Sequence, residues 1–177
     1  MSRTRLIPIA LLAALSAALA FVPACSSDKA SAAPPGYTDV RQSNATEAEL
    51  RTVLGTQSDD WAWAGGQFDT PKDQAALARD TPYEFAWKSA LTDASEAGAP
   101  DAFEMTYLLV FSTPSKGTIL RVFTTLTQYT PDANAWQKLV DSGEPITLGI
   151  RTATFNGNEL TVDGGPHEGQ TLTFTLE

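Results

Sequence analysis

The stretch most suggestive of chemistry places two acids directly before two indoles. Asp59 and Asp60 are followed closely by Trp61 and Trp63. Two carboxyl groups about 5–9 Å apart can hydrolyse a glycosidic bond, and aromatic rings can stack on sugars. The plainer interpretation is a loop before a strand, with both indoles in the core. We favour that interpretation, and the alternatives are a carbohydrate-binding module and a hydrolase that uses Asp59 or Asp60.

Other catalytic arrangements find little support in the sequence. His167 is the only residue that could act as the base of a hydrolytic triad. It stands in the polar turn Gly164–Gly169, so we predict a solvent-exposed loop residue. One His and one Cys also exclude a structural zinc site, a disulfide framework and Cys/His catalysis.

A calcium site is the remaining metal alternative. Asp59, Asp60, Asp69 and Asp73 carry the hard oxygen ligands that calcium prefers. Their spacing matches neither an EF-hand nor a nonapeptide repeat. We therefore expect no metal and no cofactor, and we predict that the protein is not an enzyme.

Composition narrows the class of protein further. The 177 residues include 12 Lys and Arg against 21 Asp and Glu, a net charge of −9. Nucleic-acid surfaces need clustered positive charge, so we exclude nucleic acid as a partner. Hydrophobic residues make up 42%, enough to bury the core of one domain with flanking segments.

The N-terminus has the layout of a secretory signal peptide. Arg3 and Arg5 precede an apolar run from Leu6 to Val22, and small residues follow up to Cys25. An uncleaved membrane anchor is the alternative, because the run just reaches the minimum length of a span. Pro8 and the lack of a following Lys/Arg cluster disfavour it.

The end of this segment, Val22-Pro23-Ala24-Cys25, resembles the bacterial lipobox. The resemblance implies that residues 1–24 are a signal peptide and that Cys25 becomes lipidated, so that a membrane is a partner. Pro23 departs from the usual small or aliphatic residue. In two-membrane bacteria, Ser26 after the cysteine favours the outer membrane. Residues 25–43 have the composition of a flexible tether.

Two helices are predicted in the mature chain. Thr46 and Glu49 match a capping box, which begins a short helix in an N-terminal extension over 44–80. In that extension, 71–79 is consistent with one or two helical turns. A second helix is expected over 132–142, with Asp132 as a possible cap and Trp136 on its apolar face.

The remaining part, 81–177, is predicted to be rich in strands. Tyr83, Phe85 and Trp87 alternate with less apolar residues, as in a half-buried strand, and we expect Trp87 and Trp136 both to be buried. Asn156-Gly157 is a strong hairpin signal. The expected strands are 83–87, 103–112, 118–129, 146–155, 159–162 and 171–176.

The order of motifs in this part is similar to that of fibronectin type III and related immunoglobulin-like domains, and to uncharacterised envelope lipoproteins of delta-type bacteria. The motifs that carry the resemblance are Pro82-Tyr83 with Phe85 and Trp87, Tyr107 with Phe111, Tyr129-Thr130-Pro131, Trp136 with Leu139, Ile150-Arg151 with Ala153, and the terminal Phe174-Thr175-Leu176.

The resemblance implies a mainly β protein with an antiparallel immunoglobulin-like sandwich. The sequence pattern adds one short helix between strands and a small helical N-terminal extension. Such domains mainly bind and space other molecules. We therefore expect a membrane-anchored envelope lipoprotein with a non-catalytic binding or structural role. An envelope protein or a glycan is its expected partner, bound through the acids at 59 and 60 or the indoles at 61 and 63.

Overall fold

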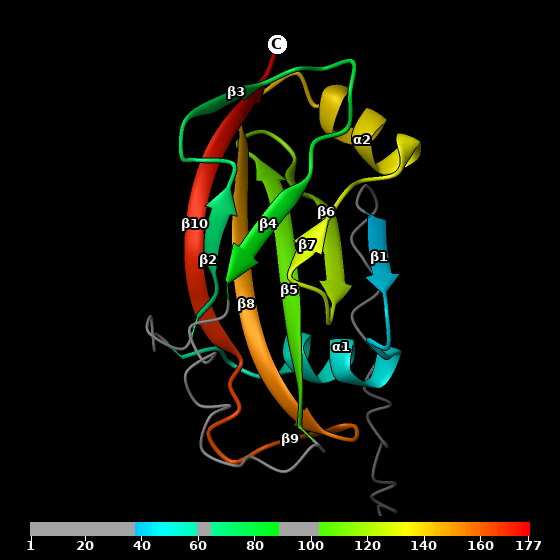
Figure 1. Cartoon of the computed structure of the whole chain (residues 1–177), viewed down its shortest axis with the longest axis vertical. Helices are drawn as coiled ribbons and strands as arrows, with labels where there is room; N and C mark the ends of the chain where they lie inside the picture. Colours follow the sequence, from blue (N-terminus) through cyan, green and yellow to red (C-terminus); the bar gives the residue numbers. More distant parts are fainter. Residues whose placement is uncertain (1–37, 60–64, 89–102) are drawn as a thin grey trace, which may run out of the picture.

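The computed structural model describes residues 38–59, 65–88 and 103–177, and over these residues the chain is mainly β (Figure 1). The described elements are β1 (Thr38–Gln42), α1 (Glu47–Gly55), β2 (Gln67–Thr70), β3 (Ala75–Leu77), β4 (Phe85–Lys88), β5 (Phe103–Thr113), β6 (Gly117–Thr124), β7 (Gln128–Tyr129), α2 (Ala133–Val140), β8 (Ile146–Asn156), β9 (Glu159–Leu160) and β10 (His167–Leu176).

These strands form two sheets. The large sheet has the order β1-β6-β5-β8-β10-β3, with β9 paired to the end of β8. The small sheet has the order β2-β4-β7 and is antiparallel. The large sheet is mixed rather than purely antiparallel, because β1 runs parallel to β6 and β3 runs parallel to β10. The antiparallel arrangement expected from the sequence therefore holds for the central strands and not for the two edges.

One face of the large sheet, the inner face, packs against the small sheet and α2. Along β5, Tyr107, Leu109 and Phe111 point to this side and join the principal hydrophobic core. Phe85 of the small sheet meets Phe111 edge-on, with ring centroids 5.2 Å apart. The fold thus places Phe85 and Trp87 of β4 between the two sheets, as the aromatic alternation of this strand predicts.

Both indoles predicted to be buried are buried. Trp87 is 2% exposed and Trp136 is 4% exposed. Asp132 caps α2 by accepting from the backbone N–H of Ala135 at 2.8 Å, and the indole N–H of Trp136 donates to the carbonyl of Arg79 at 2.8 Å. Trp136 therefore fastens the helix to the segment that follows β3.

The opposite face of the large sheet, the outer face, carries a second and smaller core under α1. Leu50 and Val53 of the helix pack with Leu108, Phe123 and Phe155 of the sheet. The predicted capping box at the start of α1 is present, with Thr46 and Glu49 each bonded to the other's backbone N–H. Among the described residues, no helix is both long and apolar enough to cross a membrane.

The structure corrects the expected role of the segment before α1. Residues 38–42 were expected to belong to a tether, yet they form β1, whose register pairs Val40 with Val122 of β6. Their sequence is only weakly β-prone, and the partner strand lies about 80 positions away. Only the folded sheet brings that partner into place.

Two further expectations change. Within 71–79 the chain forms strand β3 rather than helical turns, since it extends along β10. The strand expected over 118–129 divides into β6 and β7, and β7 leaves the large sheet to join the small one. Because β2 and β3 of the segment 44–80 pair with β4 and β10 of the segment 81–177, the two segments share the same sheets.

Candidate functional site

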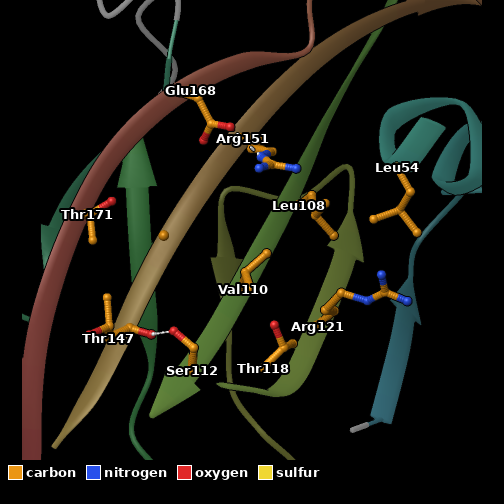
Figure 2. A pocket seen from close by; sticks show the side chains of 11 residues that line it. Leu54, Leu108, Val110, Ser112, Thr118, Arg121, Thr147, Arg151, Glu168 and Thr171 are labelled. Carbon is orange, nitrogen blue, oxygen red and sulfur yellow. Dashed lines mark hydrogen bonds and ion pairs between the residues drawn. The ribbon is translucent and has the colours of Figure 1, made fainter. Parts of the chain in front are cut away.

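The outer face of the large sheet is covered only in part. α1 lies over one end of this face, and beyond it the sheet borders a cleft of about 380 Å³ (Figure 2). This volume falls at the small end of the ~300–1,000 Å³ that is usual for small-molecule sites. The cleft is lined by Leu54, Leu108, Val110, Ser112, Thr118, Arg121, Thr147, Gly149, Arg151, Glu168 and Thr171.

Gly149 lies in the middle of this lining, on the central strand β8. In the sheet register it stands between Val110 of β5 and Thr171 of β10. A β-carbon built at Gly149 would meet only the hydroxyl of Thr171, at an ordinary 3.7 Å. The fold therefore has room for a side chain where the sequence leaves bare backbone.

Hydroxyl groups from four adjacent strands surround this position. They belong to Thr118 of β6, Ser112 of β5, Thr147 of β8 and Thr171 of β10. Ser112 donates to the carbonyl of Thr147 at 3.4 Å, across the pair that these two residues form in the sheet. Each hydroxyl can donate and accept, so this part of the cleft suits a ligand that carries several polar groups.

The first arginine of the cleft has a structural partner. Arg121 is buried and forms a two-point ion pair with Asp39 of β1, with both N···O distances at 2.6 Å. Such bidentate pairs are strong and directional. This contact joins the edge strand β1 to β6 and closes one side of the cleft.

The second arginine is more open. Nε of Arg151 lies 2.7 Å from Oε1 of Glu168, and 35% of the Arg151 side chain is exposed. Figure 2 shows its guanidinium directed across the sheet toward Leu108 and Leu54. The hydroxyl of Ser58 also donates to Glu168, so the carboxylate that orients Arg151 is held from two sides.

The structure corrects the expected position of His167. The residue opens β10 and is only 1% exposed, rather than lying in a solvent-exposed loop. Its Nδ1 lies 2.6 Å from Oδ1 of Asp59, and its Nε2 lies 3.1 Å from the carbonyl of Asp163. Because a carbonyl only accepts, Nε2 carries a hydrogen. Both ring nitrogens of His167 therefore contact other parts of the chain.

Asp59 is joined to the same strand through its backbone. Its N–H donates to the carbonyl of Pro166, and its carbonyl accepts from the N–H of Glu168, both at 3.0 Å. Asp59 thus fixes the segment before β2 against the start of β10. Asp60, Trp61 and Trp63, the other residues singled out at this position, lie outside the described residues, as does Cys25.

The acids considered for calcium have separate partners. Asp69 pairs with Lys88 at 3.1 Å, and Asp73 accepts from the backbone N–H of Thr173 at 2.8 Å. Over residues 38–59, 65–88 and 103–177, no group of three or more His, Cys, Asp or Glu side chains could hold a metal ion.

This cleft could hardly be predicted from the local sequence. Its lining comes from α1 and four strands spread between Leu54 and Thr171, so no short motif contains it. The one usable signal is Gly149, a glycine inside an otherwise β-prone run, which often marks a close approach to the backbone.

In comparisons with known proteins, no protein-family model matches the sequence, and no curated protein matches it.

Proposed function

We propose that this chain is an outer-membrane lipoprotein, anchored through Cys25, whose β-rich body has a non-catalytic binding role. We further propose that the body is an immunoglobulin-like sandwich. The single observation that carries the binding role is the open cleft on the outer face, with its bare floor at Gly149 and its exposed guanidinium at Arg151.

The sequence pattern at residues 22–25 supports the anchor. Cys25 is the only cysteine, and twelve residues separate it from Thr38, where β1 begins. Twelve residues reach at most about 40 Å when fully extended. A single acyl chain binds a bilayer reversibly, whereas two or three acyl chains hold a protein on it stably. The anchor would therefore keep the body close to the membrane that carries it.

The arrangement of the two sheets supports the immunoglobulin-like part of the proposal. The small sheet packs over the inner face of the large one, with an aromatic core between them. One short helix, α2, lies between β7 and β8, where the sequence pattern predicts a helix between strands. Immunoglobulin-like domains use their fold as a frame and their surfaces for binding, and they supply no catalytic residues to transfer here.

The position of β1 links the anchor to the cleft. β1 is the first described element after Cys25, and its Asp39 holds Arg121 at the cleft's edge. The lipidated end of the chain therefore enters the fold beside the proposed binding surface. A ligand in the envelope would meet the protein close to its point of attachment.

Metabolic labelling tests the anchor. Wild-type protein expressed in a two-membrane bacterium should incorporate labelled palmitate and fractionate with the outer membrane. Cys25→Ser should remain unlabelled and uncleaved, because the thioether forms on the sulfur before cleavage. Ser26→Ala is the matched control and should be labelled like the wild type. Labelling of Cys25→Ser, or unlabelled wild-type protein, would contradict the proposal.

A further inference from the structure

The starting observation is a glycine that the fold does not need. Glycine inside a strand is destabilising by roughly 0.5–1 kcal/mol relative to alanine. At Gly65 and Gly169 a steric reason exists, because a β-carbon there would lie 2.3 Å and 2.5 Å from backbone atoms of neighbouring segments. At Gly149 the nearest atom would be at 3.7 Å. The bare backbone at Gly149 keeps the cleft deep and serves no packing purpose.

The second observation is the orientation of Arg151. Its Nε faces Glu168, and in the part of the chain that the structure describes no hydrogen bond engages its two terminal nitrogens. Two parallel N–H groups on a guanidinium match the geometry of a carboxylate. Because Glu168, which accepts from the hydroxyl of Ser58, holds the Nε side of Arg151, the terminal edge of this guanidinium is already oriented toward the cleft.

The terminal edge of Arg151 points to an anion. Arg121 is already neutralised by its bidentate pair with Asp39, so it is not the group that would bind a ligand. Glu168 lies against Nε of Arg151, and the two terminal nitrogens of this guanidinium can bind a second carboxylate.

The hydroxyl and apolar side chains of the lining indicate the rest of that ligand. A fatty acid would place an apolar chain against the hydroxyls of Thr118, Thr147 and Thr171, and a neutral sugar would leave the terminal edge of Arg151 without an anion. A sugar that carries a carboxylate satisfies both requirements. Its hydroxyls can exchange hydrogen bonds with the Ser and Thr side chains, and its C–H face can pack on Val110, which is partly exposed.

We propose that the outer-face cleft binds an acidic sugar, with the carboxylate on Arg151 and the sugar ring over Gly149. This inference rests on the binding role proposed above and names its ligand class. It is independent of the lipid anchor, which palmitate labelling tests separately. A failure here would therefore be distinguishable from a failure of the anchor.

Calorimetry on the full chain in detergent micelles tests the proposal. The probes are methyl glucuronide and methyl glucoside, which differ by the carboxylate alone. We expect the glucuronide to bind at least about ten-fold more tightly, at concentrations up to about 10 mM that reveal millimolar dissociation constants. No binding of the glucuronide, or equal binding of the two probes, would overturn the proposal.

Two variants place the binding in the cleft. Arg151→Gln should weaken glucuronide binding by about ten-fold or more, and Gly149→Val should do the same by filling the floor. Arg79→Gln removes the same charge from an exposed position outside the cleft lining and should bind like the wild type. Thermal melts confirm that each variant is folded, and Gly149→Ala replaces Gly149→Val should the larger side chain unfold the protein. Unchanged binding in folded Arg151→Gln would overturn the assignment.

Discussion

On the inner face of β5, Leu109 and Phe111 have no exposed surface, whereas their neighbours Val110 and Ser112 on the outer face are only partly covered. The same strand thus serves a dry aromatic core on one side and an open polar cleft on the other. Alternation of side chains along a strand makes this division possible.

The chemistry of the two faces differs as much as their coverage. The inner face is so dry that burial, together with the negative charge of Asp132, raises the pKa of Tyr129. The outer face gathers hydroxyls and the guanidinium of Arg151 around a bare glycine. Stability of the fold therefore depends mainly on the inner face, which leaves the open part of the outer face available for recognition.

The largest expected effect comes from the inner face. Trp136→Ala should lower the free energy of unfolding by roughly 3–5 kcal/mol, because it removes a large buried ring and the hydrogen bond to Arg79. Trp87→Ala should cost a similar amount. Asn134→Ala, an exposed site on α2, is the control and should stay within about 0.5 kcal/mol of the wild type. Denaturant midpoints measure all three, and a wild-type midpoint for Trp136→Ala would remove α2 from the core.

A smaller effect is expected at the junction of β10 with the segment before β2. His167→Ala should destabilise the protein by about 1–3 kcal/mol, since it leaves the carbonyl of Asp163 and the carboxylate of Asp59 without this partner. Val162→Ala, at an exposed position in the turn before β10, should change stability by no more than about 0.5 kcal/mol. Equal midpoints for both variants would show that the buried histidine does not stabilise this junction.

Substitutions at Gly149 and Gly65 test which of these two glycines the fold requires. Gly149→Ala should leave stability unchanged or raise it by up to about 1 kcal/mol. Gly65→Ala should lower it by roughly 1–3 kcal/mol, because its β-carbon would collide with the backbone of Glu168. Thermal unfolding of the two variants measures the difference. A strong loss of stability in Gly149→Ala would mean that the fold requires this glycine after all.

The smallest effect concerns an exposed carboxylate outside both faces. The hydroxyl and backbone N–H of Ser115 donate to Glu144 and lower its pKa below the usual value. The stabilisation from this contact is present above the unfolded-state pKa and is lost as the pH falls through the lowered folded-state pKa. Ser115→Ala should move the pKa of Glu144 upward in an NMR titration of its side-chain carbon. An unmoved titration curve would contradict the contact.

Much of the local structure was predictable from short stretches of sequence. The capping box of Thr46 and Glu49 and the cap at Asp132 are present where expected. The hairpin signalled by Asn156-Gly157 also forms, with Gly157 and Asn158 in its turn. Each depends on contacts within three or four residues, so its determinants are all visible together in the sequence. The burial of Trp87 and Trp136 followed from the same periodicity.

The features that distinguish this protein depend on pairs that are distant in the chain. His167 was expected in solvent because its neighbours are typical of a turn, and its partner Asp59 lies 108 residues away. Arg121 and Asp39 are separated by 82 residues, and only the parallel docking of β1 on β6 joins them. Periodicity specifies which side of a strand is apolar, but not which strand becomes its neighbour. The sequence by itself therefore determined the mainly β character and the helix caps. Tertiary structure alone decided the mixed order of the strands, the buried histidine and the cleft around Gly149, because each requires strands that meet only after the chain has folded.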